Sequence, residues 1–370
     1  MQQHTICFLI RNYNNIGGTE RVTSIIANGL AQKGQNVSII CLEKGTSPYF
    51  QTNNRIKIYE FNTSSQKSGK GMGVRVQNLI NDIKVAKKLS KLIRVIKPDF
   101  IIAVDIVLYR CIHFIKIPSK LHKIGWEHFC FEARQRKLVK LSRIWASKHA
   151  DKIIVLSDAD LESYQKNYPY ATNLMRIYNP IAYNSTYNYQ SNSKIVIAAG
   201  RYAPQKGFDL LIESWSRIAD KIPDWELRIF GDGELRNELQ AQIDHYNLSN
   251  VKLCGFTKEL DRELEKASIF ALSSRFEGWG LVLIEAQAKG LPCISFNCKC
   301  GPSEIIDDGV NGLLVSPENT EEFAEKLLLL MQNEELRRSF SANAQKDLYR
   351  FDSEKVVGEW IALFDSLSKE

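Results

Sequence analysis

The stretch KIVIAAGRYAPQKGFDLLIESW, residues 194–215, decides the fold class of this 370-residue chain. Its first seven residues form an apolar, β-branched run that predicts a buried strand. A turn that contains Gly200, Pro204 and Gly207 then leads into a helical pattern. A buried strand that continues directly into a helix is the repeating unit of a parallel α/β sheet, so an α/β architecture is expected.

The same alternation of short β-rich runs with helical patterns extends over the whole chain. Strands are predicted at 5–11, 37–42, 99–104, 122–128, 152–157, 194–200, 225–231, 251–256, 268–274 and 293–296. Helices are predicted at 19–31, 75–97, 133–149, 204–220, 233–245, 258–266, 280–289, 320–332, 335–348 and 353–368. This order predicts two doubly wound, Rossmann-like domains that enclose a cleft at the carboxyl ends of their strands, where ligands of such sheets bind.

One polar segment divides the two series. YNSTYNYQSNS, residues 183–193, is rich in Asn and Ser and has no apolar period, so we interpret it as a linker. The first domain then covers residues 1–182 and the second covers residues 194–352, followed by a separate helix at 353–370. A chain of this length has enough residues for a sizeable core in each half.

The charge of the chain is divided unevenly between the halves. Residues 1–180 hold 28 Lys and Arg against 12 Asp and Glu, whereas residues 181–370 hold 21 against 30. A strongly basic half indicates an anionic partner, either nucleic acid or a membrane surface. KVAKKLSKLIRVIK (84–97) and ARQRKLVKLSRIWASKHADK (133–152) combine cations with Leu, Ile and Val on one side, as surface-lying amphipathic helices do. The alternative is an ordinary solvated helix face.

Other features of the composition exclude few classes of protein. The chain has no stretch of about 18 apolar residues and no cleavable leader pattern, so we expect a cytoplasmic protein. None of its eight cysteines shows C-x-x-C spacing, and most are expected to be small apolar core residues. Cys298 and Cys300 leave metal binding or oxidation open as an alternative.

Two βα turns have the composition of phosphate sites. Gly17 and Gly18 precede Thr19 at a predicted helix start, where unpaired amides favour an anion; the alternative is a turn that needs only a positive φ. Arg201 closes a strand and Lys206 opens the next helix, so both cations are expected to converge on a diphosphate. Two solvated surface cations are the alternative there.

A third turn places two carboxylates eight residues apart. In SRFEGWGLVLIEAQAKGLP, residues 274–292, Glu277 precedes a predicted helix and Glu285 lies inside its apolar run. A buried carboxylate needs a donor, and sugar hydroxyls are such donors. The amides of Leu281 and Val282 at the helix start would bind phosphate between the two glutamates. An internal ion pair of Glu285 with Arg or Lys is the alternative.

The ordered set of motifs closely resembles glycosyltransferase family 4, whose members are retaining enzymes of the GT-B fold. The motifs are GGTERV, GRYAPQKG, FGDGE, the E-x7-E glutamates and CGPSEII, and the resemblance covers essentially the whole chain. It implies that the C-terminal helix packs back on the N-terminal domain, which binds the acceptor. It also implies that a nucleotide sugar is a substrate and that neither a cofactor nor a metal is needed.

The resemblance implies roles for individual residues. Arg201 and Lys206 resemble the diphosphate-binding pair, Glu277 the glutamate at the donor hexose, and Glu285 the one at the ribose. Leu281 and Val282 resemble the backbone phosphate donors, and Gly17 and Gly18 the loop that closes on the donor phosphate. Gly233 and Phe256 resemble residues that line the nucleotide. His128, in WEHF, resembles a histidine near the donor sugar, although a histidine after a strand is often only a structural hydrogen bonder.

The expected function is retaining transfer of a hexose or N-acetylhexosamine from a UDP-linked donor to a growing, lipid-linked glycan of a surface polysaccharide. The protein would work at the cytoplasmic face of the inner membrane, with an anionic membrane surface as a further partner; a soluble glycan acceptor fits equally well. Three alternatives stay open: a non-hydrolysing UDP-sugar 2-epimerase of the same fold, a non-catalytic sugar-binding subunit, and a nucleic-acid-binding protein. No basic motif interleaved with aromatic residues supports the last, so no nucleic acid partner is expected.

Overall fold

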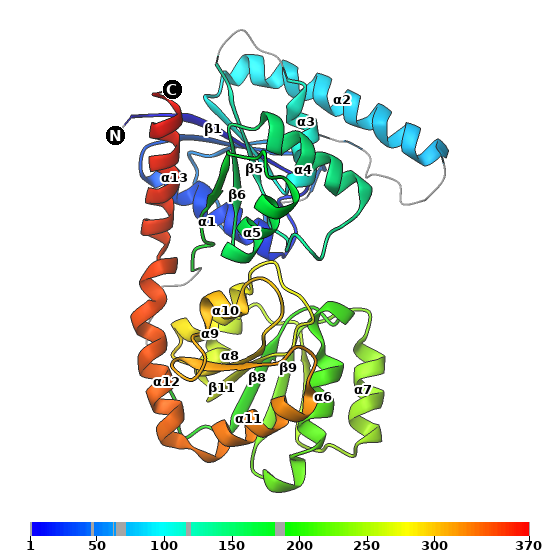
Figure 1. The fold of residues 1–370 in the computed structure, drawn as a ribbon, viewed down its shortest axis with the longest axis vertical. Coiled ribbons are helices and arrows are strands. Elements are labelled where there is room, and N and C mark those ends of the chain that lie inside the picture. The colour runs from blue at the N-terminus through cyan, green and yellow to red at the C-terminus, as the bar shows by residue number, and fades with distance from the viewer. Residues whose placement is uncertain are drawn as a thin grey trace. The chain divides into compact units, whose positions relative to one another are not determined.

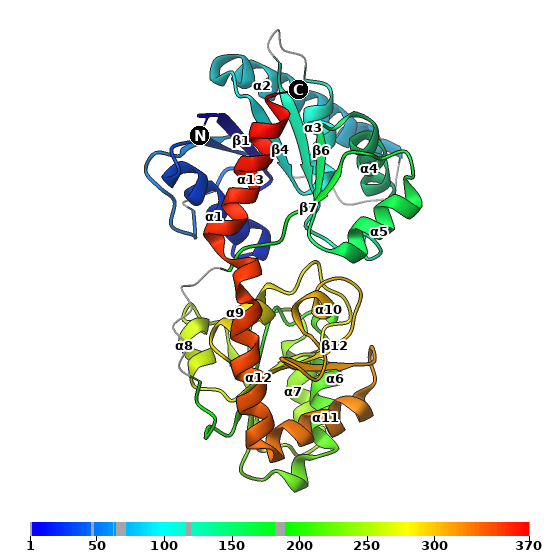
Figure 2. The same ribbon diagram turned by 60° about the vertical axis from the view of Figure 1, so that its left-hand side comes forward.

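The computed structural model describes residues 2–45, 48–61, 63, 72–115, 120–181 and 189–369, without the side chains of 72–82 and 345. The chain divides into two compact units, shown in Figures 1 and 2. Unit 1 comprises Met1–Ala182 together with Asp352–Glu370, and unit 2 comprises Tyr183–Phe351. Each unit is an α/β domain with its own parallel sheet, as the alternating sequence pattern predicts.

Unit 1 is built on a seven-stranded parallel sheet with the order β3-β2-β1-β4-β5-β6-β7. Its strands are β1 (Thr5–Ile10), β2 (Asn36–Cys41), β3 (Lys57–Glu60), β4 (Phe100–Val104), β5 (His122–Trp126), β6 (Lys152–Val155) and β7 (Leu174–Arg176). The order of the strands reverses between β1 and β4. In doubly wound sheets that reversal is the point at which ligands bind, at the carboxyl ends of the strands.

The helices of unit 1 cover both faces of this sheet (Figure 1). They are α1 (Gly18–Gln32), α2 (Met72–Ile96), η1 (Ile106–Leu108), α3 (Tyr109–His113), α4 (Lys137–His149), α5 (Asp158–Asn167) and α13 (Ser353–Leu367). The last of them, α13, packs beside α1 so closely that a Cβ on Gly29 would lie 2.5 Å from Val357. Trp360 and Phe364 of α13 are fully buried in unit 1.

Unit 2 repeats the plan with a six-stranded parallel sheet in the order β10-β9-β8-β11-β12-β13. The strands are β8 (Ile195–Ala199), β9 (Glu226–Phe230), β10 (Val251–Gly255), β11 (Ile269–Leu272), β12 (Cys293–Phe296) and β13 (Gly312–Val315). The helical segments are η2 (Pro204–Lys206), α6 (Phe208–Ser216), η3 (Ala219–Lys221), α7 (Arg236–His245), α8 (Leu260–Glu265), α9 (Leu281–Ala288), α10 (Pro302–Ile305), α11 (Thr320–Gln332), α12 (Glu334–Asp347) and η4 (Leu348–Phe351). Here the order of the strands reverses between β8 and β11.

In each unit, a cluster of buried apolar residues joins the sheet to helices that cover it. In unit 2, Val196, Leu227 and Ile269 from three strands meet Trp215 and Phe323 from α6 and α11. In unit 1, strand residues such as Leu9 and Ile101 meet Leu89 of α2 and Tyr109 of α3. Strands buried on both faces read as continuous apolar runs, which is why they were visible in the sequence.

Several predicted boundaries are wrong for local reasons. The strand predicted at 122–128 ends at Trp126, so His128 lies in the following loop, and the helix predicted from 133 begins at Lys137. The helix predicted at 204–220 is broken at Gly207, whose φ of +59° is left-handed. Lys206 therefore ends a short 3-10 turn and does not open a helix. Short elements such as β3, α5 and β13 were not predicted.

The predicted linker lies in a segment that is described only in part. The linker predicted at 183–193 overlaps residues 182–188, which lie outside the described residues, and residues 189–193 form neither helix nor strand. Helix α4 does not bury all its large apolar residues on one side, because Leu138 and Leu141 are exposed.

Among the described residues, no helix combines the length and the apolar character that crossing a lipid bilayer requires.

Candidate functional site

The candidate site of unit 2 lies where the order of its strands reverses. Strands β8 and β11 are adjacent, and the loops that follow them carry Lys206 and Glu277. The alkyl chain of Lys206 lies over Gly200, because a Cβ at Gly200 would be 3.1 Å from both Cδ and Cε of that lysine. A glycine at the end of β8 therefore makes room for the lysine side chain.

Lys206 and Glu277 form a partly buried ion pair. The Nζ atom of Lys206 donates to Oε1 of Glu277 at 2.7 Å, and the hydroxyl of Ser274 donates to the same oxygen at 2.6 Å. Both contacts described for this carboxylate thus use Oε1, and the Glu277 side chain is only 6% exposed. The sequence assigned the lysine and the glutamate to different parts of a ligand, whereas the structure brings them together.

The loops that carry these two residues are fastened to each other. Arg275 binds Asp209 through two hydrogen bonds of 2.8 and 2.6 Å, and it also donates to the carbonyl of Pro204. Gly207 approaches the other loop so closely that a Cβ would lie 2.1 Å from the carbonyl oxygen of Ser273. Burial alone would raise the pKa of Asp209, but the hydrogen bonds and charge of Arg275 lower it below its ordinary value. The sequence did not predict a role for Arg275 or Asp209, because the two residues meet only in the folded protein.

Helix α9 starts four residues after Glu277. Gly280, with a left-handed φ of +89°, precedes the helix and provides no side-chain cap. The first amides of a helix have no carbonyl partner within it, so the N–H groups of Leu281 and Val282 are available for an anion. Glu285 lies further along α9 and is 3% exposed, between the buried Ile284 and Ala286. The predicted position of Glu285 inside an apolar helix is therefore what the structure shows.

The remaining predicted residues of unit 2 follow the carboxyl ends of neighbouring strands. Arg201 is exposed just after β8, and Phe256, 52% exposed, follows β10. Gly233 follows β9 and packs on the backbone of Tyr202, where a Cβ would lie 2.5 Å from the carbonyl oxygen. This glycine thus has a packing reason of its own, separate from any nucleotide.

Cys298 is a member of the site that the sequence did not identify as one. It is buried after β12, where burial and the negative charge of Glu277 raise the pKa of its thiol to about 12, while Lys206 opposes the shift. The thiol is therefore neutral and lies within electrostatic range of the Lys206–Glu277 pair. Its proximity depends on the fold of the loop after β12, so spacing in the sequence offered no signal.

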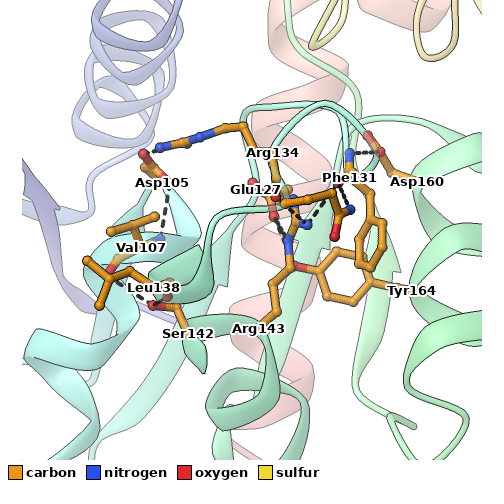
Figure 3. Close-up of polar contacts among 11 residues, drawn as sticks. Asp105, Val107, Glu127, Phe131, Arg134, Leu138, Ser142, Arg143, Asp160 and Tyr164 are labelled. Atoms are coloured by element: carbon orange, nitrogen blue, oxygen red, sulfur yellow. Dashed lines mark hydrogen bonds and ion pairs between the residues drawn. The ribbon is translucent and has the colours of Figure 1, made fainter. Parts of the chain in front are cut away.

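In unit 1, the loop after β5 carries His128 and is held by a buried ion pair (Figure 3). Arg143 reaches from α4 to Oε2 of Glu127 at 2.8 Å and donates to the carbonyl of Phe131 at 2.9 Å. Tyr164 of α5 donates to the same glutamate oxygen at 3.0 Å. Burial raises the pKa of Glu127 to about 7, and the charge of Arg143 opposes that shift.

His128 itself is buried, and its Nε2 atom has no hydrogen-bond partner among the described residues. Burial lowers the pKa of the imidazole to about 3, so His128 is neutral at physiological pH. A neutral imidazole can donate one hydrogen bond and accept another, but it cannot supply a positive charge.

The glycine pair at the start of α1 is not there to allow a positive φ. Gly17 has an extended φ of −133°, so the alternative of a turn that requires positive φ is wrong. A Cβ on Gly17 would lie 2.3 Å from Oε2 of Glu20, whose carboxylate lies against the first turn of α1. Burial raises the pKa of Glu20. The helix start predicted to favour phosphate therefore already has an acidic group of the chain beside it.

Models of two protein families match this chain, one on each unit. Residues 16–184 match the model described as "Glycosyltransferase Family 4", and residues 184–347 match "Glycosyl transferases group 1". The chain is also similar in fold to a TarM variant from S. aureus, crystallised with Fondaparinux, alpha-GlcNAc-glycerol and UDP. The TM-score is 0.81 at 19% identity, over 98% of this chain and all of that one.

Three curated relatives align with nearly the whole chain. An uncharacterized glycosyltransferase of Haemophilus influenzae is 32% identical over 96% of this chain and 98% of its own length. The amylovoran biosynthesis glycosyltransferase AmsD of Erwinia amylovora is 28% identical over the same shares. An alpha-1,4-N-acetyl-D-galactosaminyltransferase of Campylobacter jejuni, named for a PP-undecaprenol-linked acceptor, is 26% identical over 97% of each chain. With two parallel sheets, both family models and a full-length relative above 30% identity, this chain belongs to the family 4 glycosyltransferases of the GT-B fold.

Proposed function

We propose that this glycosyltransferase moves a hexose or N-acetylhexosamine, with retention of configuration, from a UDP-linked donor to a lipid-linked glycan of a surface polysaccharide. The observation that carries the proposal is the Lys206–Glu277 pair at the strand-order reversal of unit 2, with Glu277 four residues before the start of α9. Two relatives support the finer points: TarM was crystallised with UDP, and the Campylobacter enzyme is named for an acceptor on PP-undecaprenol.

The donor diphosphate would bind where fixed positive charge is concentrated. Lys206 would contact it together with the first-turn amides of Leu281 and Val282, with Arg201 as a second cation. Negative charge grows on the diphosphate as the glycosidic bond breaks, so these groups would stabilise the transition state more than the ground state. Glu285 would hold the ribose hydroxyls, and Gly233 and Phe256 would line the nucleotide.

Glu277 would position the sugar and would not attack it. Its Oε1 already accepts hydrogen bonds from Lys206 and Ser274, which leaves Oε2 to accept from a sugar hydroxyl. In the proposed step, the bond from the anomeric carbon to phosphate breaks and a bond to the acceptor oxygen forms on the same face. The acceptor proton moves to the departing phosphate oxygen, so no nucleophile of the protein is required. The family resemblance also assigns His128, Gly17 and Gly18 to donor binding, and these roles stay predictions.

The donor is identified by incubating the protein with UDP- and GDP-linked sugars and measuring nucleotide release by mass spectrometry. We expect Lys206→Ala to lower kcat by about 10²–10³, the range for loss of one transition-state charge contact. Lys221→Ala, at an exposed lysine of the same unit, is the matched control and should retain full activity. Wild-type turnover in both Lys206→Ala and Glu285→Ala would overturn the proposed site.

The remaining parts of the proposal have separate tests. Retention predicts an α-linked product from an α-linked donor, which NMR of the purified product measures directly. Independence from metal predicts unchanged turnover in the presence of EDTA. A location at the cytoplasmic face of the inner membrane predicts that the protein fractionates with membranes at low salt and leaves them at high salt.

A further inference from the structure

Helix α4 exposes apolar residues and buries polar ones. Its inner face consists of Val139, Ser142, Arg143, Ala146 and Ser147, of which three are polar or charged. Arg143 is inside because it pairs with Glu127 at zero exposure. Leu138 and Leu141, by contrast, are 43% and 38% exposed on the outer side. A helix that only had to cover the core of unit 1 would be expected to have the opposite arrangement.

Aromatic side chains extend this exposed apolar surface onto the end of α3. Phe114, directly after α3, is 62% exposed, and its ring meets Trp145 of α4 edge-on at 5.3 Å. The ring of His113 stacks on that of Trp145 at 5.1 Å and meets the ring of Phe114 edge-on at 4.6 Å. We call Phe114, Leu138, Leu141 and Trp145, with the neighbouring Lys137, Lys140 and Lys148, the α3–α4 face.

The charge of this region has one sign. Residues 136–149 contain Arg136, Lys137, Lys140, Arg143 and Lys148 but no Asp or Glu. Lys137, Lys140 and Lys148 are exposed. Helix α2, which contacts α3, adds exposed cations and again no acid over residues 83–98, namely Lys84, Lys87, Lys88, Lys91 and Arg94. Apolar and aromatic side chains surrounded by lysines complement the surface of an anionic lipid bilayer, which has an apolar interior below a layer of negatively charged headgroups.

We propose that the α3–α4 face docks on an anionic lipid bilayer, with Phe114, Leu138, Leu141 and Trp145 entering the interfacial layer and the lysines contacting lipid phosphates. This docking proposal rests on the proposed function, because a lipid-linked acceptor lies at the surface of a lipid bilayer. The binding itself needs no turnover. Its failure can therefore be separated from a failure of the glycosyl transfer.

The test uses the full-length protein and sedimentation with phosphatidylcholine vesicles that contain or lack phosphatidylglycerol. Binding is expected only to the anionic vesicles. Lys137→Ala with Lys140→Ala should weaken it by about fivefold for each lysine, or about thirtyfold for the pair. Leu138→Ser with Leu141→Ser should weaken it by about tenfold through lost apolar burial. Lys57→Ala with Lys221→Ala changes net charge equally at two exposed lysines outside the face and should leave binding unchanged.

Tryptophan fluorescence tests which residues enter the bilayer. Trp145 is partly exposed, whereas Trp126, Trp215, Trp225, Trp279 and Trp360 are all buried at 8% exposure or less. Vesicles of brominated phosphatidylglycerol should therefore quench emission from Trp145. Trp145→Phe should remove most of the quenching while the protein still sediments with the vesicles.

Several outcomes would overturn the docking face. One is an equal loss of binding in the control pair, and another is quenching that survives in Trp145→Phe. A third is a wild-type protein that binds duplex DNA but not anionic vesicles. A fourth is a fall from dimer to monomer in Leu138→Ser with Leu141→Ser while vesicle binding is unchanged, which would assign the face to a second copy of the chain. Release of UDP in solution is measured for every variant. If the wild type releases no UDP but binds anionic vesicles, the proposed function is wrong and the docking proposal stands.

Discussion

Glu127 and Arg143 form an ion pair in which both side chains have zero exposure. A buried pair of this kind costs desolvation energy, and removing one partner leaves an uncompensated charge. Here the pair fixes a loop, because Arg143 also binds the backbone of Phe131 and of Arg134. His128 lies in that loop. The pair is therefore in a position to orient His128, a predicted functional residue of unit 1.

The raised pKa of Glu127 predicts a pH dependence of stability. In the folded protein its pKa is about 7, against an ordinary value of 4.5, so between these values the folded state binds a proton that the unfolded state does not. The contribution of Glu127 to the free energy of unfolding is therefore largest below about pH 4.5 and falls as pH rises to about 7. Glu127→Gln should lack this fall, a difference of at most about 3 kcal/mol across the window.

Urea unfolding of both proteins at several pH values measures the effect on unit 1. Glu132→Gln, at an exposed glutamate of the same loop, is the control and should follow the wild type. A constant difference in unfolding free energy between Glu127→Gln and the wild type from pH 5 to 7 would contradict the assignment.

At the scale of elements, the candidate site of unit 2 consists of two loops joined by Arg275. The backbone N–H of Arg275 donates to the carbonyl of Gln205 at 2.9 Å, and its guanidinium binds Asp209 and the carbonyl of Pro204. These contacts tie the turn that carries Lys206 to the loop that carries Glu277. Precise placement of charged groups matters in such a site, because displacement by about 1 Å can cost about a hundredfold in rate.

Arg275→Ala should therefore lower kcat by about ten- to a hundredfold, with a smaller change in KM for the donor. Arg275→Lys should restore little, because a lysine cannot reproduce the two-pronged contact with Asp209. The double variant with Asp209→Ala should be no worse than Arg275→Ala alone, since both break one contact. Arg217→Ala, which breaks exposed ion pairs on the same unit, is the control. An unchanged kcat with only a lower Tm would show that Arg275 is merely structural.

At the scale of the whole molecule, the chain leaves unit 1 after its seventh strand and comes back to it with the last helix. Trp360 of α13 packs on Trp126 at 4.9 Å, and Phe364 packs on Phe100 at 4.6 Å. His4 near the N-terminus pairs with Asp365 at 2.8 Å. Helix α13 is thus part of the core of unit 1, although the 169 residues of unit 2 precede it in the sequence.

Removal of residues 352–370 should unfold unit 1 and leave unit 2 folded. The lost helix buries seven apolar side chains, each worth about 1.5–3 kcal/mol, and their sum exceeds the usual stability of a domain. Limited proteolysis with mass spectrometry should show cleavage throughout residues 2–181 and protection of the sheet of unit 2. Full protection of β1 and β4 in the truncated protein would contradict this expectation.

The sequence by itself determined the class of architecture, most strands and helices, and the chemical character of the candidate site. Buried parallel strands are continuous apolar runs, and local rules govern turns such as the one between Gly200 and Gly207. The sequence alone therefore predicted that Lys206 and Glu277 follow strands and that Glu285 lies inside a helix. The roles of these residues remain predictions that the activity measurements test.

Only the tertiary structure decided which side chains meet. The pairs Lys206 with Glu277 and Arg275 with Asp209 each join segments more than 60 residues apart. The inverted burial of α4 depends on a glutamate in another element, Glu127, which draws Arg143 inward and leaves Leu138 and Leu141 outside. The apolar periodicity of a helix predicts which of its faces is buried. A single buried ion pair can turn a different face inward, and such a pair forms only when distant segments pack together.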